Sequence, residues 1–489
     1  MDLTTRLVRG AKAFFGARVV YALANAVLLF ALTRYLLDPA AYGLLYFAVS
    51  VVGVGAMLAT LGLPKSTGRY VTEFLATDAG QVPHVLSISV RYLTVLAIAV
   101  AGGIVLFHRP LARLLGDPTL TPFLLLGAVF VIARAFFSYL TNVFQGFNRV
   151  EYTAAISVVN SLTRVVGAIG LVLLGLGALG AFAGYVAGYA AGAVVGLVAL
   201  RTHFLADLNA ATEPAADLTR RLLEYSVPTA ATRLSVVLDS RIDKVLLGVL
   251  VGPVAVGFYT LAKQIADFCI VPATALGFTI SPALGDQHAD ERTGRAATLY
   301  ERSMENVLLL YVPAAVGLAL VAEPAIRFVV GTDYLGAVPV LRLFSFFVVV
   351  RAVHKITGNG LDYLGLARIR ALARGTAAGS NVVLNLLLIP PYGVMGAAVA
   401  TVTTYSAYTA VNVYYIHREL DLGMGYLAER TLRIGVIALA MGGVVWLARP
   451  GITGILSLAA VVLLGATVWS ILSVASGLLD PGEVRGLLA

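Results

Sequence analysis

The stretch that decides the fold runs from Tyr152 to Leu200 and reads YTAAISVVNSLTRVVGAIGLVLLGLGALGAFAGYVAGYAAGAVVGLVAL. It contains one charged residue, Arg164. A helix needs about 20 predominantly apolar residues to cross a bilayer, so the stretch is long enough for two crossings. Lipid offers no hydrogen bonds to the backbone, and an α-helix satisfies its backbone groups internally. The stretch therefore predicts two consecutive transmembrane helices, 152–175 and 178–200.

Similar segments recur along all 489 residues, of which 59% are hydrophobic and only 12% are charged. Soluble domains are about half apolar and about a quarter charged, so both values indicate a membrane protein. No long polar block remains for a soluble domain. We predict an all-α, polytopic membrane protein with about 14 transmembrane helices. The predicted spans are 11–36, 42–63, 84–107, 122–144, 152–175, 178–200, 226–250, 254–280, 304–321, 337–358, 371–389, 393–416, 431–448 and 452–477.

The Lys and Arg residues between these spans predict the orientation. If the N-terminus is cytoplasmic, the cytoplasmic segments hold 19 Lys and Arg residues and the outer segments hold 5. Cytoplasmic loops of membrane proteins carry such an excess. The first apolar segment is also longer than the apolar region of a cleaved signal peptide. We therefore expect a multi-pass protein of the plasma (inner) membrane with both termini in the cytoplasm.

A short motif occurs twice and indicates an internal repeat. The motif Pro-x-Ala-x-Gly spans Pro39–Gly43 after span one and Pro253–Gly257 after span seven. A six-helix repeat returns the chain to the same side, so the two halves are expected to be parallel copies with a substrate path between them. Three further pairs keep the same order: Leu61-Gly62 with Leu276-Gly277, Gly146–Arg149 with Gly365–Arg368, and Leu179–Ala181 with Met395–Ala397. The predicted parts are a six-helix lobe (1–202), a cytoplasmic linker (203–224), a second six-helix lobe (225–425), and two extra helices with a tail (426–489).

Several function classes lack their sequence signatures. The single cysteine, Cys269, allows neither a disulfide framework nor a thiolate metal site. The chain has no Walker loop, no His-x-x-x-His metal helix and no nucleophile elbow, so we expect no enzyme, no metal site and no cofactor. The net charge of +9 is explained by the basic cytoplasmic loops, so we expect no nucleic-acid partner. Transport by alternating access remains.

The cations inside the predicted spans indicate where transport occurs. A Lys or Arg at the bilayer centre costs about 2.5–3.5 kcal/mol on insertion scales. Any single one can snorkel to the interface or form a structural ion pair, but the whole set indicates a hydrated basic cavity. Its 11 members are Arg18, Arg91, Arg134, Arg164, Arg233, Arg241, Lys244, Lys263, Arg342, Arg351 and Lys355.

Span seven separates its charges onto two faces. At about 100° per residue, Arg233, Lys244 and Arg241 lie at about 0°, 20° and 80°. Asp239 and Asp243 lie at about 240° and 280° on the same wheel. We infer that the basic face lines the cavity and that the acidic face meets a neighbouring helix or an ion.

The first six spans determine the sign of the cavity. They contain Arg residues but no Asp or Glu in their cores, and uncompensated guanidinium groups attract phosphate or carboxylate. We therefore expect an anionic substrate. In span ten, His354 is expected to be a hydrated polar residue rather than a metal ligand. The substrate-binding candidates are Arg18, Arg233, Arg241, Lys244, Arg91, Arg134, Arg164, Arg351 and Lys355. The candidate ion-coupling or structural carboxylates are Asp239, Asp243 and Asp267.

Short motifs over most of the chain resemble a known family, the polysaccharide-export flippases. This family belongs to the multidrug, oligosaccharidyl-lipid and polysaccharide exporter superfamily. The resemblance rests on the order of the motifs rather than on one signature. The motifs are Tyr35-Leu36-Leu37-Asp38-Pro39-x-x-Tyr42-Gly43, Glu224-Tyr225-Ser226-x-Pro228, Asp243-Lys244-x-x-Leu247-Gly248, Val256-Gly257-x-Tyr259 and Asn381-x-x-x-Asn385-x-x-x-Ile389-Pro390-x-Tyr392-Gly393-x-x-Gly396-Ala397-Ala398.

The resemblance implies both an architecture and an activity. The architecture is two six-helix lobes around a V-shaped cavity, with two extra helices. The activity is flipping of a polyprenyl-phosphate- or pyrophosphate-linked oligosaccharide to the outer leaflet, for surface polysaccharide or glycoprotein assembly. The implied partners are this lipid-linked substrate, membrane lipids, and polymerase or glycosyltransferase proteins.

Two other functions stay open. A cation-coupled multidrug exporter of the same superfamily is expected to have twelve helices and carboxylates in its first lobe. A non-transporting membrane scaffold for glycan assembly would have no use for costly cations within its spans.

Overall fold

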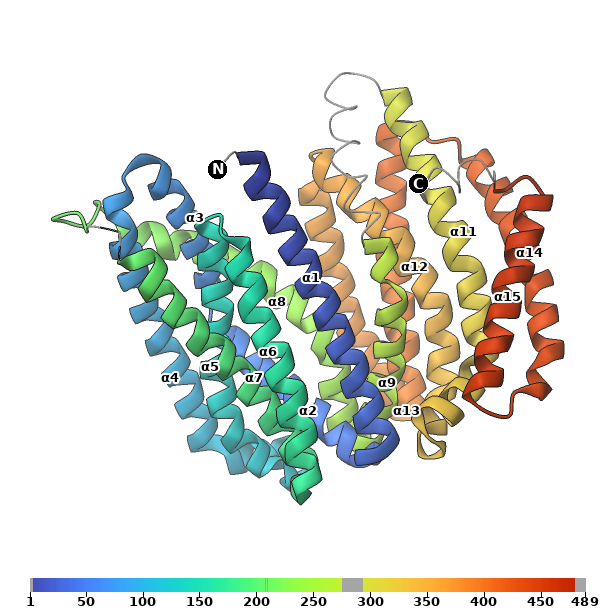
Figure 1. Ribbon diagram of the computed structural model, residues 1–489, viewed down its shortest axis with the longest axis horizontal. Helices are drawn as coiled ribbons and strands as arrows, with labels where there is room; N and C mark the ends of the chain where they lie inside the picture. Colours follow the sequence, from blue (N-terminus) through green and yellow to red (C-terminus); the bar gives the residue numbers. More distant parts are fainter. Residues whose placement is uncertain (1–2, 207, 209, 275–292, 480–489) are drawn as a thin grey trace. The chain divides into compact units, whose positions relative to one another are not determined.

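The computed structural model describes the backbone of residues 3–479 except 207, 209 and 275–292. The side chains of 3–12, 14, 231–240, 293, 359 and 363 also lie outside the described residues. The chain divides into two compact units, Met1–Gly257 and Phe258–Ala489, and each is described by itself. All regular structure in the described residues is helical (Figure 1), which confirms the all-α prediction.

The first unit is built from long helices with short connections. Most of its helices pack side by side, α3 lies at one end of the unit, and α8 begins near α3 and runs past the other helices (Figure 1). Its elements are α1 (Leu3–Ala31), η1 (Leu32–Leu36), α2 (Pro39–Leu58), α3 (Leu63–Thr77), η2 (Ala79–Gln81), α4 (Val82–Leu114), η3 (Pro118–Leu120), α5 (Thr121–Gly146), α6 (Val150–Leu171), η4 (Val172–Leu176), α7 (Gly177–Leu200), η5 (Arg201–Leu205), α8 (Leu218–Leu250) and the start of α9 (Pro253–Cys269).

The second unit continues α9 and adds further long helices. Within it, α12 packs against α11 and α13, and α14 packs against α11 and α15. Its remaining elements are α11 (Thr293–Ala325), η6 (Ile326–Val330), η7 (Thr332–Ala337), α12 (Val338–Tyr363), α13 (Ala367–Leu420), α14 (Met424–Ala448), η8 (Arg449–Gly451) and α15 (Ile455–Ala475).

Ten helical stretches in the described residues are long and apolar enough to cross a membrane. Two of them, Val150–Leu205 and Ala367–Leu420, each contain a break at glycine. Gly175 has φ 88° and Gly393 has φ 56°, a left-handed backbone that glycine adopts without steric cost. Each of these stretches therefore holds two of the predicted spans, while α8 and α9 occupy spans seven and eight. Each of the fourteen predicted spans thus contains a described helix, and residues 275–280 of span eight lie outside the described residues.

The surface of these helices is apolar. Leu114, Leu174 and Leu456 are among many large hydrophobic side chains that are mostly exposed. Soluble monomers rarely expose contiguous apolar surface on this scale, whereas lipid tails solvate it readily. The chain is therefore a multi-pass membrane protein.

Hydropathy alone did not reveal α3. The chain leaves α2 through a left-handed turn at Leu61 (φ 37°) and Gly62 (φ 79°), and a new helix begins at Leu63. This helix buries Tyr70 and Val71 on one face and exposes charged side chains on the other. Because its polar face lowers its mean hydropathy, most of this helix falls between the predicted spans 42–63 and 84–107.

Polar contacts fasten α3 to the start of α8. The hydroxyl of Ser66 donates to the carbonyl of Leu222 at 2.9 Å, and the hydroxyl of Tyr70 donates to the carbonyl of Arg221 at 3.1 Å. The guanidinium of Arg221 pairs with Glu73 at 2.5 Å. These bonds set the position of α8 within the first unit, and α8 carries part of the candidate site.

The two copies of the Pro-x-Ala-x-Gly motif pack against each other in the first unit. A Cβ on Gly43 would overlap the carbonyl oxygen of Pro253 and lie 2.9 Å from the backbone nitrogen of Gly257. A Cβ on Gly257 would overlap the carbonyl oxygen of Pro39. The contact is reciprocal, as across a two-fold axis, and only glycine permits such a close approach of backbones. This geometry is consistent with the internal repeat.

The last two helices are fastened to α11 in the second unit. Near one end of α14, Arg430 pairs with Glu305 at 3.2 Å. Near the other end, Glu323 of α11 forms an ion pair with Arg449. An apolar core closes the contact on the side of Glu323, and it consists of Val321, Val445, Ile452, Leu458 and Val461. The α14–α15 hairpin is thus packed firmly against α11.

Candidate functional site

Basic side chains of three helices come together with four tyrosines in the first unit. The helices are α5, α6 and α8, and the tyrosines belong to α1, α2 and α7. We call this group the arginine–tyrosine cluster. Its members are Arg134, Arg164, Arg241, Tyr21, Tyr46, Tyr185 and Tyr189.

Arg164 is the most deeply buried member, with 4% of its surface exposed. Its Nη2 donates to the amide oxygen of Asn25 at 3.1 Å, and its Nε is buried without a hydrogen-bond partner. Its guanidinium carbon lies 5.1 Å from the ring centroid of Tyr185 and 5.4 Å from that of Tyr21, in cation–π geometry. No carboxylate in the described part of the chain pairs with it. A buried, unpaired charge is costly and indicates function rather than stability.

Arg134 projects from α5 towards α7. Its guanidinium carbon lies 5.5 Å from the ring centroid of Tyr189 and 5.7 Å from that of Phe130. It makes neither an ion pair nor a hydrogen bond with any described residue. One turn before Tyr189 on α7, the hydroxyl of Tyr185 is hydrogen-bonded to that of Tyr46 at 2.9 Å. The donors of Arg134 are therefore available to a ligand.

Arg241 reaches from α8 to α2. Its Nη1 donates to the carbonyl of Val49 at 2.7 Å, and its guanidinium lies directly over Gly53. A Cβ at Gly53 would lie 2.9 Å from Nε of Arg241 and would overlap the rest of the guanidinium. Gly53 therefore creates the space that this guanidinium occupies.

The three guanidinium groups form one electrostatic group. Arg134 acts on Arg241 as a like charge, and all three arginines act on Tyr189. Like charges that stay together without a carboxylate raise the local affinity for anions. Guanidinium also binds phosphate and carboxylate through two parallel hydrogen bonds. The cluster is thus suited to an anionic ligand, and the described residues contain no group of His, Cys, Asp or Glu arranged for a metal ion.

Other candidates of the first unit lie apart from this group. Arg18 on α1 and Arg91 on α4 are exposed. On α8, Lys244 is partly buried and Asp243 is fully buried, so the two adjacent charges have different environments. Arg233 and Asp239 have side chains outside the described residues.

The candidates of the second unit belong to a separate basic group. Arg351 forms an ion pair with Asp267, which is one of the predicted carboxylates. Arg370, which falls between the predicted spans 337–358 and 371–389, forms an ion pair with Asp362. Lys355 lies on α12 one turn after Arg351. Carboxylates compensate this group in part, in contrast to the arginine–tyrosine cluster.

The expectation that His354 is hydrated is wrong. Only 7% of its surface is exposed, and its ring centroid lies 4.7 Å from that of Tyr408 and 5.0 Å from that of Tyr405. Two tyrosines of α13 cover the imidazole, and a pattern within α12 could not reveal them.

The uncharged members of the site were not among the residues predicted from the sequence. Tyr185 and Tyr189 are four residues apart on α7, and this spacing on an apolar helix was an available signal for one polar face. Asn25 was the polar residue of an otherwise apolar stretch of span one. Gly53 gave no signal, because Gly53 resembles the many other glycines of the chain.

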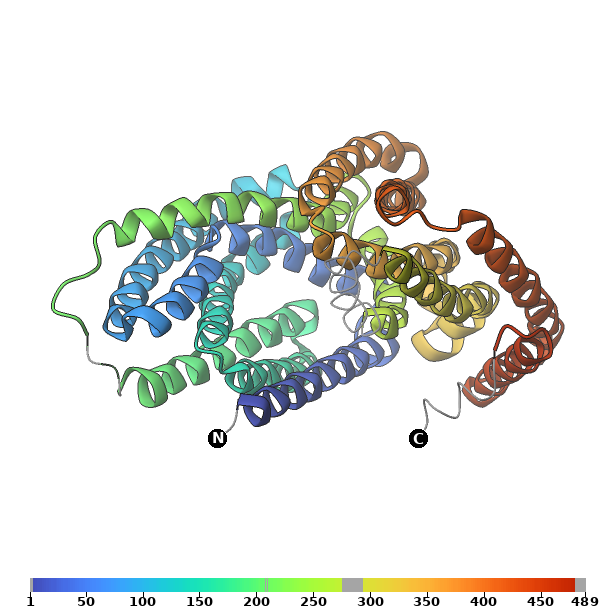
Figure 2. The same ribbon diagram turned by 90° about the horizontal axis from the view of Figure 1, so that it is seen from above.

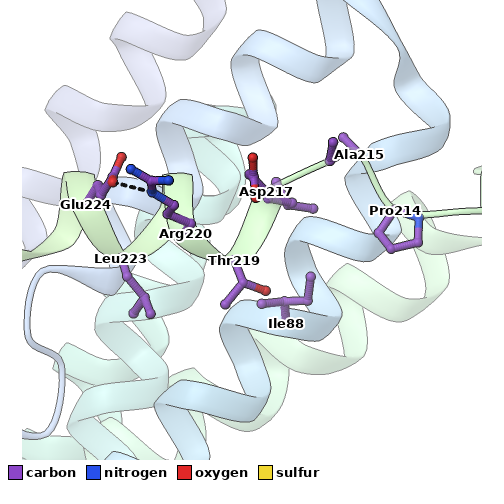
Figure 3. A pocket seen from close by; sticks show the side chains of 10 residues that line it. Ile88, Pro214, Ala215, Asp217, Thr219, Arg220, Leu223 and Glu224 are labelled. Carbon is purple, nitrogen blue, oxygen red and sulfur yellow. Dashed lines mark hydrogen bonds and ion pairs between the residues drawn. The ribbon is translucent and has the colours of Figure 1, made fainter.

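A cleft of about 690 Å³ lies at the start of α8 (Figure 3). It is lined by residues 214–220 together with Ile88, Leu223 and Glu224. Its cation, Arg220, pairs with Glu224 at 2.7 Å, and both side chains are exposed. Because this charge is compensated, the cleft is not the anion site.

A multi-pass helical fold with uncompensated arginines among its spans is typical of a membrane transporter. Residues 7–281, more than half of the chain, match the family described as polysaccharide biosynthesis protein. Residues 228–387 match the MatE family. The chain belongs to the polysaccharide biosynthesis protein family.

Relatives and solved structures agree with this assignment. The chain is 22% identical over 384 residues to the probable low-salt glycan biosynthesis flippase Agl15 of Haloferax volcanii, covering 78% of each chain. It is 25% identical over 411 residues to the probable flippase AglR of the same organism, covering 81% of this chain and 80% of that one. The fold is similar to the lipid II flippase MurJ in an inward closed conformation, with a TM-score of 0.75, 15% identity, and 99% and 100% of the two chains covered.

Proposed function

We propose that the protein is a flippase that moves a polyprenyl-phosphate- or pyrophosphate-linked oligosaccharide from the cytoplasmic to the outer leaflet. The observation that carries this proposal is the arginine–tyrosine cluster, in which three guanidinium groups lie together without a carboxylate partner among the described residues. The relative Agl15, which is described as a probable low-salt glycan biosynthesis flippase, supports this substrate class, and AglR, described as a probable flippase, supports the activity.

The proposed mechanism follows from the cost of moving a charge through lipid. A phosphate crossing the bilayer core must exchange water for other hydrogen-bond donors, and guanidinium groups supply them in pairs. Arg134 and Arg241 bind the phosphates in this mechanism, and the rings of Tyr46 and Tyr189 border the adjoining sugar. The prenyl tail stays in lipid while the halves of the protein rock between inward and outward access.

The remaining parts of the proposal concern the wider site and its setting. Arg351 and Lys355 form a second basic region for acidic groups of the glycan. Arg18, Arg91, Arg233 and Lys244 are further proposed contacts along the path. The protein is proposed to lie in the plasma membrane with both termini in the cytoplasm, as the charge of its loops indicates. Glycan polymerases or glycosyltransferases are its proposed protein partners, and it catalyses no covalent step itself.

A binding experiment tests the proposed substrate class. Purified protein is titrated with farnesyl pyrophosphate, with farnesol and with the cationic dye ethidium. We expect saturable binding of the pyrophosphate and much weaker binding of the alcohol, which has the same tail without the charge. Ethidium is expected not to compete. Equal binding of farnesol and its pyrophosphate would contradict the anion site.

The second candidate function is a cation-coupled multidrug exporter, and the match of residues 228–387 to the MatE family favours it. Two observations oppose it. The predicted spans of the first half contain no acidic residue, and the described cluster is basic. Ion-gradient-dependent ethidium efflux from proteoliposomes would support this second function instead.

Replacing Gly53 by alanine tests whether Arg241 needs the space that this glycine leaves for its guanidinium group. The new methyl group overlaps the guanidinium, so Arg241 leaves the cluster and transport is expected to fall roughly tenfold, the effect of one lost charged hydrogen bond. Gly55→Ala on the same helix is the control, because its Cβ would come closest to the flexible end of Ile104, at 3.2 Å, and would meet Val100 and Val131 at an ordinary contact distance of 3.6 Å. Initial transport rates of both variants at equal protein levels are the measurement. Equal rates would refute the role of Gly53.

A further inference from the structure

Asn25 accepts the hydrogen bond of Arg164 that a substrate oxyanion would accept. Its amide oxygen receives Nη2 of Arg164 at 3.1 Å, and its amide nitrogen donates to the carbonyl of Tyr21 at 2.8 Å. The bond to Tyr21 fixes the orientation of the amide, so its oxygen faces the guanidinium. Arg164 thus holds a neutral acceptor, while its Nε stays buried without a partner.

This hydrogen bond joins α1 to α6. Figure 2 shows the two helices side by side at the edge of the first unit, and α6 is the main packing partner of α1 within it. Tyr21 lies one turn before Asn25 and adds its cation–π contact to Arg164. The opposite side of α1, with Leu23 and Val27, is exposed. Arg164 is therefore a polar link between α1 and the remainder of this unit.

We propose that Asn25 is a latch that competes with the substrate for Arg164. A phosphate oxygen displaces the amide oxygen, and α1 is then free to move away from α6. A phosphate carries negative charge and can accept two parallel hydrogen bonds from a guanidinium, whereas the amide of Asn25 is neutral, so phosphate wins the exchange and a neutral lipid alcohol does not. The inference rests on the proposed function and adds to it a coupling between headgroup recognition and helix movement.

Two substitutions at Asn25 have opposite expected effects on affinity. Asn25→Ala removes the competitor, so the Kd for farnesyl pyrophosphate is expected to fall about three- to tenfold. Asn25→Asp places a carboxylate on Arg164, so the Kd is expected to rise at least about tenfold. A merely structural role for Asn25 predicts weaker binding in both variants. Farnesol, which lacks the anion, is the control ligand and is expected to be insensitive to both changes.

A distance measurement reports the movement of α1 independently of affinity. Because Cys269 is the single cysteine, Cys269→Ala allows spin labels at Val19 and Leu162, which are exposed on α1 and α6. Farnesyl pyrophosphate is expected to lengthen and broaden the distance distribution in otherwise unchanged protein. Asn25→Ala is expected to produce the longer distances without ligand, and Asn25→Asp to keep the short distance with ligand present.

The possible results distinguish a failure of the latch hypothesis from a failure of the proposed function. If the unchanged protein binds farnesyl pyrophosphate but Asn25→Ala binds it equally or more weakly, the latch is wrong and the anion site stands. If ligand binds without changing the distance between α1 and α6, the latch is also wrong. If the unchanged protein binds no farnesyl pyrophosphate at all, the headgroup site fails and the latch fails with it.

Discussion

Replacing Arg134 and Arg241 together by glutamine is expected to abolish transport while the protein stays folded in the membrane. Each guanidinium supplies charge-assisted hydrogen bonds worth about 1.5–3 kcal/mol, so each single variant is expected to lose roughly ten- to hundredfold in rate. Removing both charges also removes a like-charge repulsion, so stability is expected to hold or to rise. The measurement is the initial rate of lipid-linked oligosaccharide translocation at matched protein levels.

The control for this experiment is Arg220→Gln. Arg220 is exposed at the start of α8 and pairs with Glu224, so its loss is expected to leave the rate unchanged. Lysine at Arg134 or Arg241 is expected to restore part of the rate, since it keeps the charge without the two-pronged geometry. A double variant that transports at the rate of Arg220→Gln would show that the arginine–tyrosine cluster does not bind the substrate.

Alanine at Gly43 is expected to have the largest effect on stability. The added methyl group overlaps the carbonyl of Pro253, which is backbone and has no rotamer to change. Overpacking a tight contact costs about 1–3 kcal/mol and sometimes more, so the melting temperature is expected to fall by several degrees. Gly257→Ala is expected to match it because the contact is reciprocal.

A control variant and a double variant test whether the loss of stability in Gly43→Ala comes from the backbone contact. Gly103→Ala on α4 is the control, since a Cβ there would meet no atom within 4 Å. The double variant Gly43→Ala with Gly257→Ala is expected to be less destabilised than the sum of the two, because one displacement relieves both overlaps. Thermal unfolding in detergent measures all four proteins. Additive losses, or a melting temperature of Gly43→Ala equal to that of Gly103→Ala, would contradict the backbone contact.

The fold was predictable because bilayer thickness sets the length of each apolar segment. Each predicted span contains a helix of the described residues, although spans 42–63 and 452–477 run past the ends of theirs and residues 275–280 of span eight lie outside the described residues. Hydropathy could not reveal α3, since the polar face of an amphipathic helix lowers its mean hydropathy. The helix break at Gly393 was predictable as a gap between spans, but its left-handed backbone was not.

The positive charge of the site was predictable, but the residues that form it were not. Spans without acidic residues indicated an anion site, because charge can be counted in a sequence. Which arginines meet depends on helix rotation and packing, so Arg134, Arg164 and Arg241 were not distinguished from Arg18 and Arg91, which are exposed. Uncharged partners were missed for the same reason: the roles of Asn25 and Gly53 exist only through Arg164 and Arg241 in space.

Translocation of a labelled polyprenyl-pyrophosphate oligosaccharide in proteoliposomes tests the central claim most directly. Glycan that reaches the opposite leaflet is measured by its accessibility to a membrane-impermeant glycosidase, with protein-free liposomes as the baseline. We predict translocation well above this baseline, and its loss in the Arg134→Gln, Arg241→Gln double variant. Translocation at the protein-free rate would contradict the proposed flippase function. Translocation that the double variant leaves unchanged would contradict the role of the arginine–tyrosine cluster.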